Sequence, residues 1–195
     1  MKKSKIILIV CCIVLVVFLA LSAKVIDKGT ESQYTGEVTF DASESSSGDW
    51  DAVLAEITGK AEDIGSVDLA ALGDGTAVSL KGTVSEYVSK AAGKKNSITV
   101  VPEGYSGDAV FSVQLGSIYS GTAVRDAQTV KAFGDFTNQT EWSQYAKALN
   151  SQLDELVVAP LAIDESVQGK TVTIVGAATA SGSEVTITPV AITIE

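Results

Sequence analysis

Arg125 is the only arginine among the 14 basic residues of this chain. A planar guanidinium group offers paired donors that suit a carboxylate, a phosphate or two sugar hydroxyls better than an ammonium group does. Candidate protein acceptors follow nearby in the sequence, at Asp126, Asp135 and Glu141. Two interpretations are open: a structural ion pair that ties a strand expected at 111–124 to the next helix, or a ligand site.

Amide and aromatic side chains lie just beyond this arginine. Asn138 and Gln139 suit the paired hydrogen bonds that sugars make, but Asn138 with Glu141 three residues later also resembles a helix capping box. Trp142 and Tyr145 offer a stacking platform for a sugar, yet their spacing matches the apolar face of a helix and favours core packing. Each of these residues therefore has a structural and a functional interpretation.

Carboxylates give two further candidates. Asp126 and Asp135 could form the acid pair of a glycoside hydrolase, although the sequence does not set their separation. A second acidic group suggests a cation site, but a solvated helix face is the commoner arrangement and is what we expect. Its members are Asp49, Asp51, Glu56, Glu62 and Asp63.

The residues that are missing exclude several classes of site. The chain contains no histidine, which rules out Ser-His-Asp and Cys-His nucleophile systems and histidine metal sites. Both cysteines, Cys11 and Cys12, fall in the N-terminal apolar run, and no calcium loop of the D-x-D-x-D-G type is present. We therefore expect no metal, no cofactor and no enzymatic activity.

The first 24 residues predict a membrane attachment. Lys2, Lys3 and Lys5 precede an uncharged run from Ile6 to Ala23, which is typical of a single-pass signal anchor with a cytoplasmic N-terminus. Cleavage as a signal peptide and lipidation of a cysteine are the alternatives. We expect the rest of the chain to be periplasmic or extracellular.

Charge limits the partners of that exported part. The chain has 14 basic and 24 acidic residues. Four of the lysines flank the apolar run (Lys2, Lys3, Lys5 and Lys24), so the remainder has 10 basic against 24 acidic residues, a net charge of −14. Such a surface repels phosphate backbones, and we expect no nucleic acid partner.

Periodicity predicts the elements that must position these residues. A polar stalk is expected at 25–48, a helix from Asp49 to about Ile64, and a second helix that begins after Asn138 and ends near Pro160. Alternating apolar residues predict strands around 78–84, 97–100, 111–115, 172–174, 185–187 and 190–194. The fold class is therefore mainly β with two flanking helices (α+β), as a small OB-like barrel or pair of barrels, with a β-sandwich as the alternative.

The segment at 116–150 resembles a known family. It contains Gly121-Thr-Ala-Val-Arg-Asp-Ala127, then Asp135-Phe-Thr-Asn-Gln139, then Ala148-Leu-Asn150. These runs are similar to those of a bacterial family of predicted periplasmic lipoproteins, domain of unknown function 2291. The resemblance extends over most of 49–195 and marks a candidate ligand site or structural network: Gly121, Thr122, Arg125, Asp126, Asp135, Asn138, Gln139 and Glu141.

The resemblance implies a location and a setting. Members of the family are extracytoplasmic and membrane-attached, and are often encoded beside sugar-import transporters of the ATP-binding-cassette (ABC) type. It favours an accessory or binding module, with a transporter component or a small solute as partner. A structural or envelope-assembly protein without a ligand is the second hypothesis, and a hydrolase that uses acids alone is the third.

Overall fold

The computed structural model describes residues 40–89, 96–116 and 118–195. Residues Asp41–Glu195 form one compact unit, which contains all the helices and strands described below. The anchor expected at 1–24, and the stalk as far as residue 39, lie outside the described residues. Within the described ranges, no helix has the length and apolar character needed to span a bilayer.

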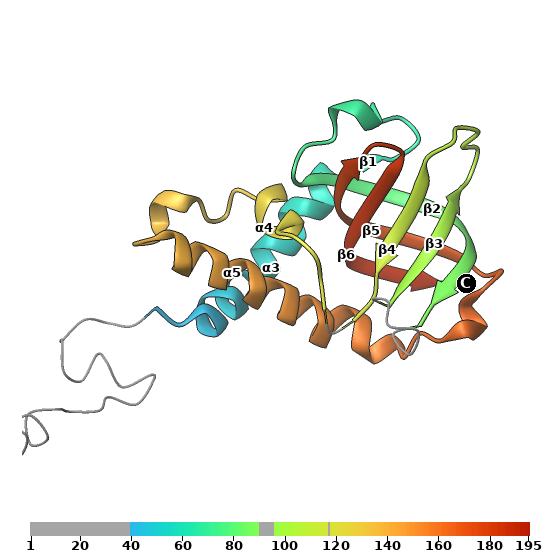
Figure 1. Cartoon of the computed structure of the whole chain (residues 1–195). Helices are drawn as coiled ribbons and strands as arrows, with labels where there is room; N and C mark the ends of the chain where they lie inside the picture. Colours follow the sequence, from blue (N-terminus) through green and yellow to red (C-terminus); the bar gives the residue numbers. More distant parts are fainter. Residues whose placement is uncertain (1–39, 90–95, 117) are drawn as a thin grey trace, which may run out of the picture. The chain divides into compact units, whose positions relative to one another are not determined.

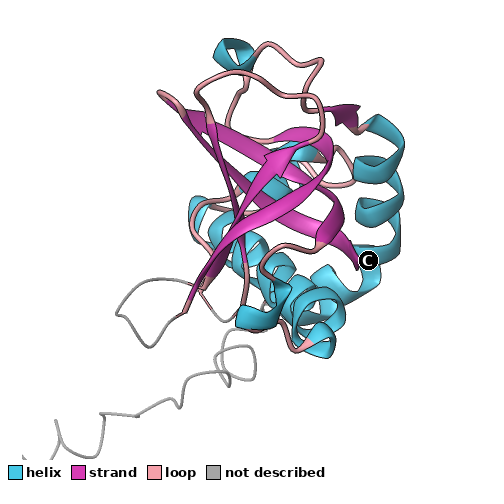
Figure 2. Cartoon of the chain, turned by 90° about the vertical axis from the view of Figure 1, so that its right-hand side faces the viewer, coloured by secondary structure: helices cyan, strands magenta, loops and turns pink. Residues whose placement is uncertain are grey.

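Five strands form a closed barrel (Figures 1 and 2). Their order around the barrel is β2-β3-β4-β6-β5, and β5 pairs again with β2 to close it. All neighbours are antiparallel except β4 and β6, which are parallel. The strands are β2 (Thr76–Val88), β3 (Ser97–Pro102), β4 (Val110–Gln114), β5 (Thr171–Ser181) and β6 (Glu184–Ile194).

The barrel interior is filled by the alternating apolar residues of these strands. Each fully buried Val, Leu, Ile or Phe stabilises the fold by about 1.5–3 kcal/mol. Glycine is required where a neighbouring strand comes too close for a side chain: a Cβ on Gly82 would lie 2.3 Å from the Val101 carbonyl oxygen, and one on Gly176 would lie 2.4 Å from that of Thr188. The interior residues include Val78, Leu80, Val84, Ile98, Val100, Phe111, Val113, Val172, Ile174, Val185 and Ile187.

Helix α3 (Ala42–Lys60) begins earlier than the sequence predicted. The Asp41 carboxylate accepts hydrogen bonds from the backbone N–H groups of Ser43 and Glu44, at 2.9 and 3.0 Å, so Asp41 is the N-cap. The expected start at Asp49 was wrong, and residues 42–48 of the expected stalk are helical. Small polar residues suggested a tether, but this cap and the burial of Ser46 hold the first turns in place.

Helix α5 (Gln139–Leu153) has the expected N-cap, because Asn138 Oδ1 accepts from the Glu141 N–H at 3.0 Å. Its predicted apolar face is correct as far as Leu153. A π-turn, η4 (Asp154–Val158), then inserts an extra residue and changes the phase. Val158 is consequently buried, whereas Leu156 is 52% exposed, contrary to the prediction that Leu156 shares the buried face.

Short elements complete the unit. They include a two-residue strand β1 (Glu62–Asp63), parallel to β2, and a short helix α4 (Ala123–Ala127). The strand expected from residue 111 is confirmed as β4, but its expected continuation to 124 was wrong, because β4 ends at Gln114 and the chain turns into α4. The 3-10 turns are η1 (Leu69–Ala71), η3 (Phe133–Asp135), η5 (Ala159–Leu161) and η6 (Glu165–Val167).

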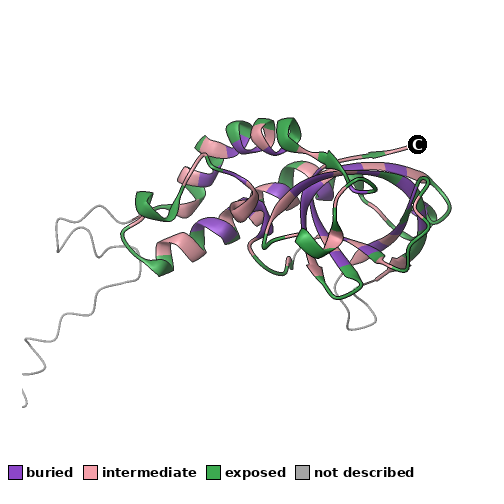
Figure 3. Cartoon of the chain, turned by 90° about the horizontal axis from the view of Figure 1, so that it is seen from above, coloured by how far each residue is buried: buried purple, intermediate pink, exposed green. Residues whose placement is uncertain are grey.

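The architecture is thus one OB-like barrel with helices on one side (Figure 1). Neither a β-sandwich nor a second barrel is formed by the described residues. Helices α3 and α5 pack together beside the barrel, and their buried faces continue its core (Figure 3). The helical side therefore carries the 121–141 segment. An open groove lies on the outer face of β3, β4 and β6.

Candidate functional site

Arg125 lies in α4 and is largely buried, with 12% of its side chain exposed. Its Nε and Nη2 atoms donate to Asp126 Oδ1 at 2.8 and 2.6 Å. Its guanidinium carbon lies 4.4 Å from the centre of the Trp142 ring, in cation–π geometry. The arginine therefore joins α4 to α5 by stacking, and its acceptor is the neighbouring Asp126 among the three carboxylates that the sequence offered.

The residues before Arg125 shape the entry to α4. Gly121 has φ of +80°, a conformation that favours glycine, and its carbonyl oxygen accepts from Asn150 Nδ2 at 3.4 Å. The Thr122 hydroxyl contacts Asp126 Oδ2, so both oxygens of this carboxylate are engaged. These contacts fix α4 against α5.

The second half of the motif mainly satisfies backbone groups. Asp135 Oδ2 accepts from the Ala132 N–H at 2.8 Å, and Glu141 Oε2 accepts from the Thr137 N–H at 2.9 Å. Gln139 is exposed in the first turn of α5. The structure thus brings Thr122, Arg125 and Asp126 together, and it places Asp135 and Glu141 in separate local contacts.

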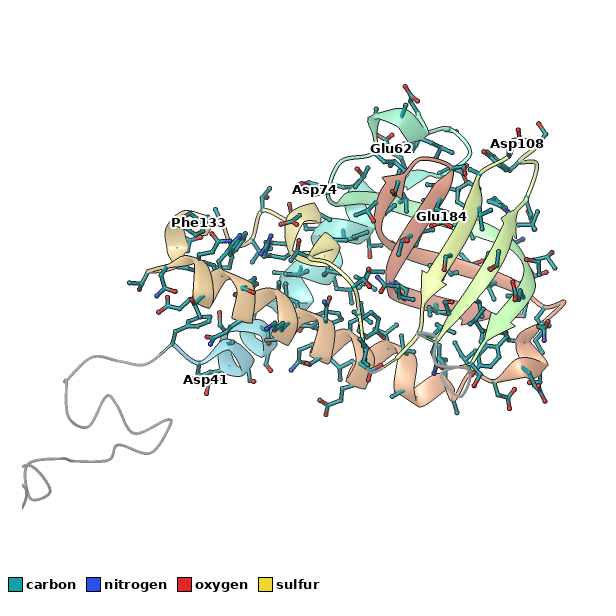
Figure 4. All side chains as sticks on the ribbon, in the orientation of Figure 1. Asp41, Glu62, Asp74, Asp108, Phe133 and Glu184 are labelled. Atoms are coloured by element: carbon teal, nitrogen blue, oxygen red, sulfur yellow. The ribbon has the colours of Figure 1, made fainter. Side chains whose placement is uncertain are left out.

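An aromatic cluster underlies the arginine. The Trp142 ring lies 6.1 Å from Tyr145 in a stacked arrangement and 5.0 Å from Phe136. Tyr145 is fully buried and donates to Asp49 Oδ2 at 3.1 Å, and burial raises the pKa of its hydroxyl. Phe133, at the end of the helical part away from the barrel, meets Trp142 edge to face and is half exposed (Figure 4). The helical spacing correctly predicted packing for Trp142 and Tyr145.

Glu56 was assigned to a solvated helix face, and that assignment was wrong. Its carboxylate accepts from the Thr129 N–H at 2.9 and 2.8 Å and from the Thr129 hydroxyl at 2.6 Å, and it pairs with Lys60. Burial raises the pKa of this carboxyl, but the hydrogen bonds from Lys60 and Thr129 outweigh that effect and lower it from 4.5 to about 2. Glu56 thereby fixes the segment after α4 to α3.

Gln128 is a residue that the sequence did not single out. It is buried, and its amide nitrogen donates to the carbonyl oxygens of Arg125 and Lys131 at 2.9 and 2.8 Å. Its amide oxygen accepts from the Lys131 N–H at 2.8 Å. A glutamine in a loop gives no periodic signal, so only its position in the fold reveals this role.

An open groove lies elsewhere, on the outer face of the barrel. It has a volume of about 480 Å³. The pairing register places Thr99 beside Ser112 and Ser112 beside Thr186, so three hydroxyls lie in a row across β3, β4 and β6. The lining residues are Val88, Ser97, Thr99, Val110, Ser112, Glu184 and Thr186.

The groove combines three kinds of surface. Hydroxyl groups can both donate and accept, valine methyl groups offer apolar contact, and Glu184 supplies one carboxylate where β6 begins (Figure 4). No lysine or arginine is among the described residues that line it. Such a surface suits a neutral ligand that carries both hydroxyl and C–H groups.

Comparison with known protein families identifies the family of this chain. The sequence model of a family described as a predicted periplasmic lipoprotein (DUF2291) matches residues 72–193. The chain belongs to this family. The resemblance noted in the 121–139 motifs is therefore confirmed, and all eight motif residues fall within the matched range, whereas α3 precedes it.

A solved structure shows the same fold. An OB-fold protein from Thermotoga maritima is 15% identical in sequence, with a TM-score of 0.59. The match covers 81% of this chain and 100% of that one. No curated protein matches the sequence. The likeness confirms the OB-like barrel, and family membership indicates an extracytoplasmic, membrane-associated protein.

Proposed function

We propose that this member of the DUF2291 family is a non-catalytic binding module that takes a neutral, hydroxylated solute such as a monosaccharide. The hydroxyl row formed by Thr99, Ser112 and Thr186 on the outer face of the barrel is the observation that supports this proposal. The ligand would lie across β3, β4 and β6.

The chemistry of the groove matches that of a sugar. The row of hydroxyls can exchange donor and acceptor roles with ligand hydroxyls, and Glu184 can accept from two adjacent ones. Val88 and Val110 can contact the C–H groups of the ring. A volume of about 480 Å³ lies within the range of about 300–1,000 Å³ that is common for small-molecule sites.

Charge argues for a neutral ligand. OB barrels also bind oligonucleotides on this face, but that use depends on basic residues that neutralise phosphates. This chain has a net charge of −10, and among the described residues that line the groove the charged one is Glu184. The charge of the chain therefore favours uncharged sugars over sugar phosphates and nucleic acids.

A role in sugar uptake extends the proposal. The module would be held on the outer side of the membrane and would serve an ABC-type sugar importer, as its family resemblance suggested. Co-purification of the full chain with such a transporter from its own host would support this extension. Recovery of the importer at the level of an untagged control would contradict it, and would leave solute binding to be judged separately.

A thermal-shift screen of the full chain tests the binding proposal. Monosaccharides, the same sugars as phosphates, and divalent cations form the panel. A sugar present at about 100 times its dissociation constant should stabilise the fold by about 2.7 kcal/mol. The matching sugar phosphate should have little effect. A flat response to every neutral sugar would refute the proposal.

Two variants place the ligand in the groove. Thr186→Val removes a hydroxyl while it keeps the shape, and should weaken sugar binding about tenfold, as expected for a hydrogen bond of about 1.4 kcal/mol. Thr193→Val is the matched control, because Thr193 is an exposed residue of the same strand outside the groove. Equal affinity of the two variants would contradict this location.

A structural role without a ligand is the second candidate. The observation that favours it is the engagement of the family motif, in which Arg125 binds Asp126 and stacks on Trp142. Under this hypothesis the motif maintains the helical side for assembly with other envelope proteins. Stability that depends on Arg125, together with silence across the sugar panel, would support it over the binding proposal.

A further inference from the structure

A second cleft lies between α5 and the loop that follows β4. Its volume is about 360 Å³, and no residue is shared with the barrel groove. One wall consists of Ile118 and Tyr119, and the other is the face of α5 that carries Lys147, Asn150 and Ser151. Asp154 and Glu155 line its far end, where α5 passes into the π-turn.

The Tyr119 side chain lines this cleft and is fixed by two hydrogen bonds. Its hydroxyl accepts from the Gly116 N–H at 3.0 Å and donates to Asp154 Oδ1 at 3.1 Å. Burial raises the pKa of this phenol, so the group remains a protonated donor at physiological pH. The aromatic ring is thereby held in one position and can support a flat ligand group.

The π-turn sets the far end. π-helical turns inside α-helices are rare and often occur at functional sites. Here the turn begins at Asp154, directly after the buried Leu153. Asp154 and Glu155 line the cleft as the helix widens, so the irregular backbone and the cleft coincide.

Opposite charges mark the two ends of the cleft. Lys147 and Glu155 are eight residues apart, which corresponds to about 12 Å along a helix axis, too far for an i,i+4 pair. In the part of the chain that the structure describes, neither side chain forms an ion pair. A cation and an anion are therefore presented at opposite ends of a groove with amide and hydroxyl groups between them.

We propose that this cleft binds a short peptide with free termini, its carboxylate at Lys147 and its ammonium group at Glu155. An extended chain of three residues spans about 10 Å, close to the separation of the two charges along the helix. One Nδ2 hydrogen of Asn150 donates to Gly121, and the other hydrogen and Oδ1 can bind a peptide bond between the two charges. The charged ends and the central amide distinguish this ligand from the neutral sugar of the barrel groove.

Triglycine is the probe, because the proposal rests on backbone and terminal groups. The full chain, labelled with ¹⁵N, is titrated with triglycine and, in parallel, with N-acetyl-triglycine amide, which lacks both charges. Free triglycine should bind with a dissociation constant of about 1 mM or tighter and should shift the amide signals of 118–119 and 147–155. The blocked peptide should bind at least tenfold more weakly.

Matched variants decide the orientation. Lys147→Ala and Glu155→Gln should each weaken triglycine binding about tenfold, whereas Lys81→Ala, at a half-exposed lysine of β2 outside the cleft, should not. All three sites are at the surface, so folding should persist and can be confirmed from the unshifted signals of the barrel. Absence of shifts at the cleft, or equal binding by the blocked peptide, would overturn the proposal.

Peptide binding at the cleft is independent of sugar binding in the groove. Lys147→Ala should leave the response to monosaccharides unchanged, and Thr186→Val should leave triglycine binding unchanged. Loss of both ligands in either variant would contradict two separate sites. If triglycine binds and no neutral sugar does, the peptide site at the cleft would be supported and the sugar site in the groove would be refuted.

Discussion

The barrel and the helical side are held together by different kinds of interaction. The barrel closes around alternating Val, Ile, Leu and Phe residues, and its core contains few polar contacts. The helical side depends instead on hydrogen bonds between specific polar groups. They join Glu56 to Thr129, Gln128 to the backbone of its own loop, Arg125 to Asp126, and Tyr145 to Asp49. The difference implies that the stability of the barrel depends little on pH. Docking of the 121–141 segment depends on the charge state of individual side chains.

Truncation in the barrel core should have the largest effect. Leu80 is 1% exposed, and Leu80→Ala should reduce the free energy of unfolding by about 2–5 kcal/mol, because it leaves a cavity in a closed interior. Chemical denaturation measures the change. Val101→Ala is the control, since Val101 is 53% exposed on the outer face of β3, and it should cost less than about 1 kcal/mol. Similar losses for both variants would show that the interior is not the main source of stability.

The contrast between the barrel and the helical side also explains which features could be predicted from the sequence. Alternation located every strand of the barrel, because one face of each strand is buried and the other is wet. Strand closure between β2 and β5, and the two register shifts, depend on backbone pairing between distant segments. No local pattern contains that information, so a sandwich and a second barrel stayed open as alternatives.

The candidate sites follow the same division. Arg125, Asp126 and Asn138 were singled out because they stand in a compact motif, and the structure shows the contacts each one makes. Thr99, Ser112 and Thr186 of the proposed groove gave no signal, since each is an ordinary wet-face residue until the register brings them side by side. The start of α3 was misplaced because a run of small polar residues is typical of a tether, although Asp41 caps it as a helix.

Loss of a buried amide should come second in size. Gln128→Ala removes the partners of two carbonyl oxygens and one N–H group. Leaving buried polar groups unsatisfied costs about 1–3 kcal/mol. Amide hydrogen exchange should become faster in 126–137 and remain slow in the barrel strands. Uniform acceleration across the molecule would show that this segment and the barrel unfold as one unit.

Acid should loosen the helical side before the barrel. The Glu56 carboxyl has a pKa of about 2 in the fold against 4.5 for an unperturbed group. A lowered pKa means that its contribution is fully present above pH 4.5 and is lost as the pH falls towards 2. The expected loss is about 1 kcal/mol, because these hydrogen bonds lie at the surface, where solvent screens the charge.

Exchange rates at Thr129 and its neighbours, measured between about pH 5 and pH 2 after correction for intrinsic rates, would report this loosening. Glu56→Gln should flatten the pH dependence of that segment, since a neutral amide does not titrate. Asp51→Asn is a suitable control, because Asp51 is an exposed acid of the same helix. An unchanged pH profile in Glu56→Gln would assign the acid response to other carboxyl groups.

The smallest effect is expected at the single arginine. Arg125→Lys keeps the positive charge but loses the paired contact of Nε and Nη2 with Asp126 and the stacking on Trp142. Because lysine keeps a cation that can still pair with Asp126 and lie against the Trp142 ring, the loss is the difference between two similar contacts, and unfolding should become easier by about 0.5–1 kcal/mol. Trp142 fluorescence should change because the guanidinium group leaves its ring. A loss of several kcal/mol would mean that α4 is essential to the fold, and the barrel would no longer be the more robust of the two regions.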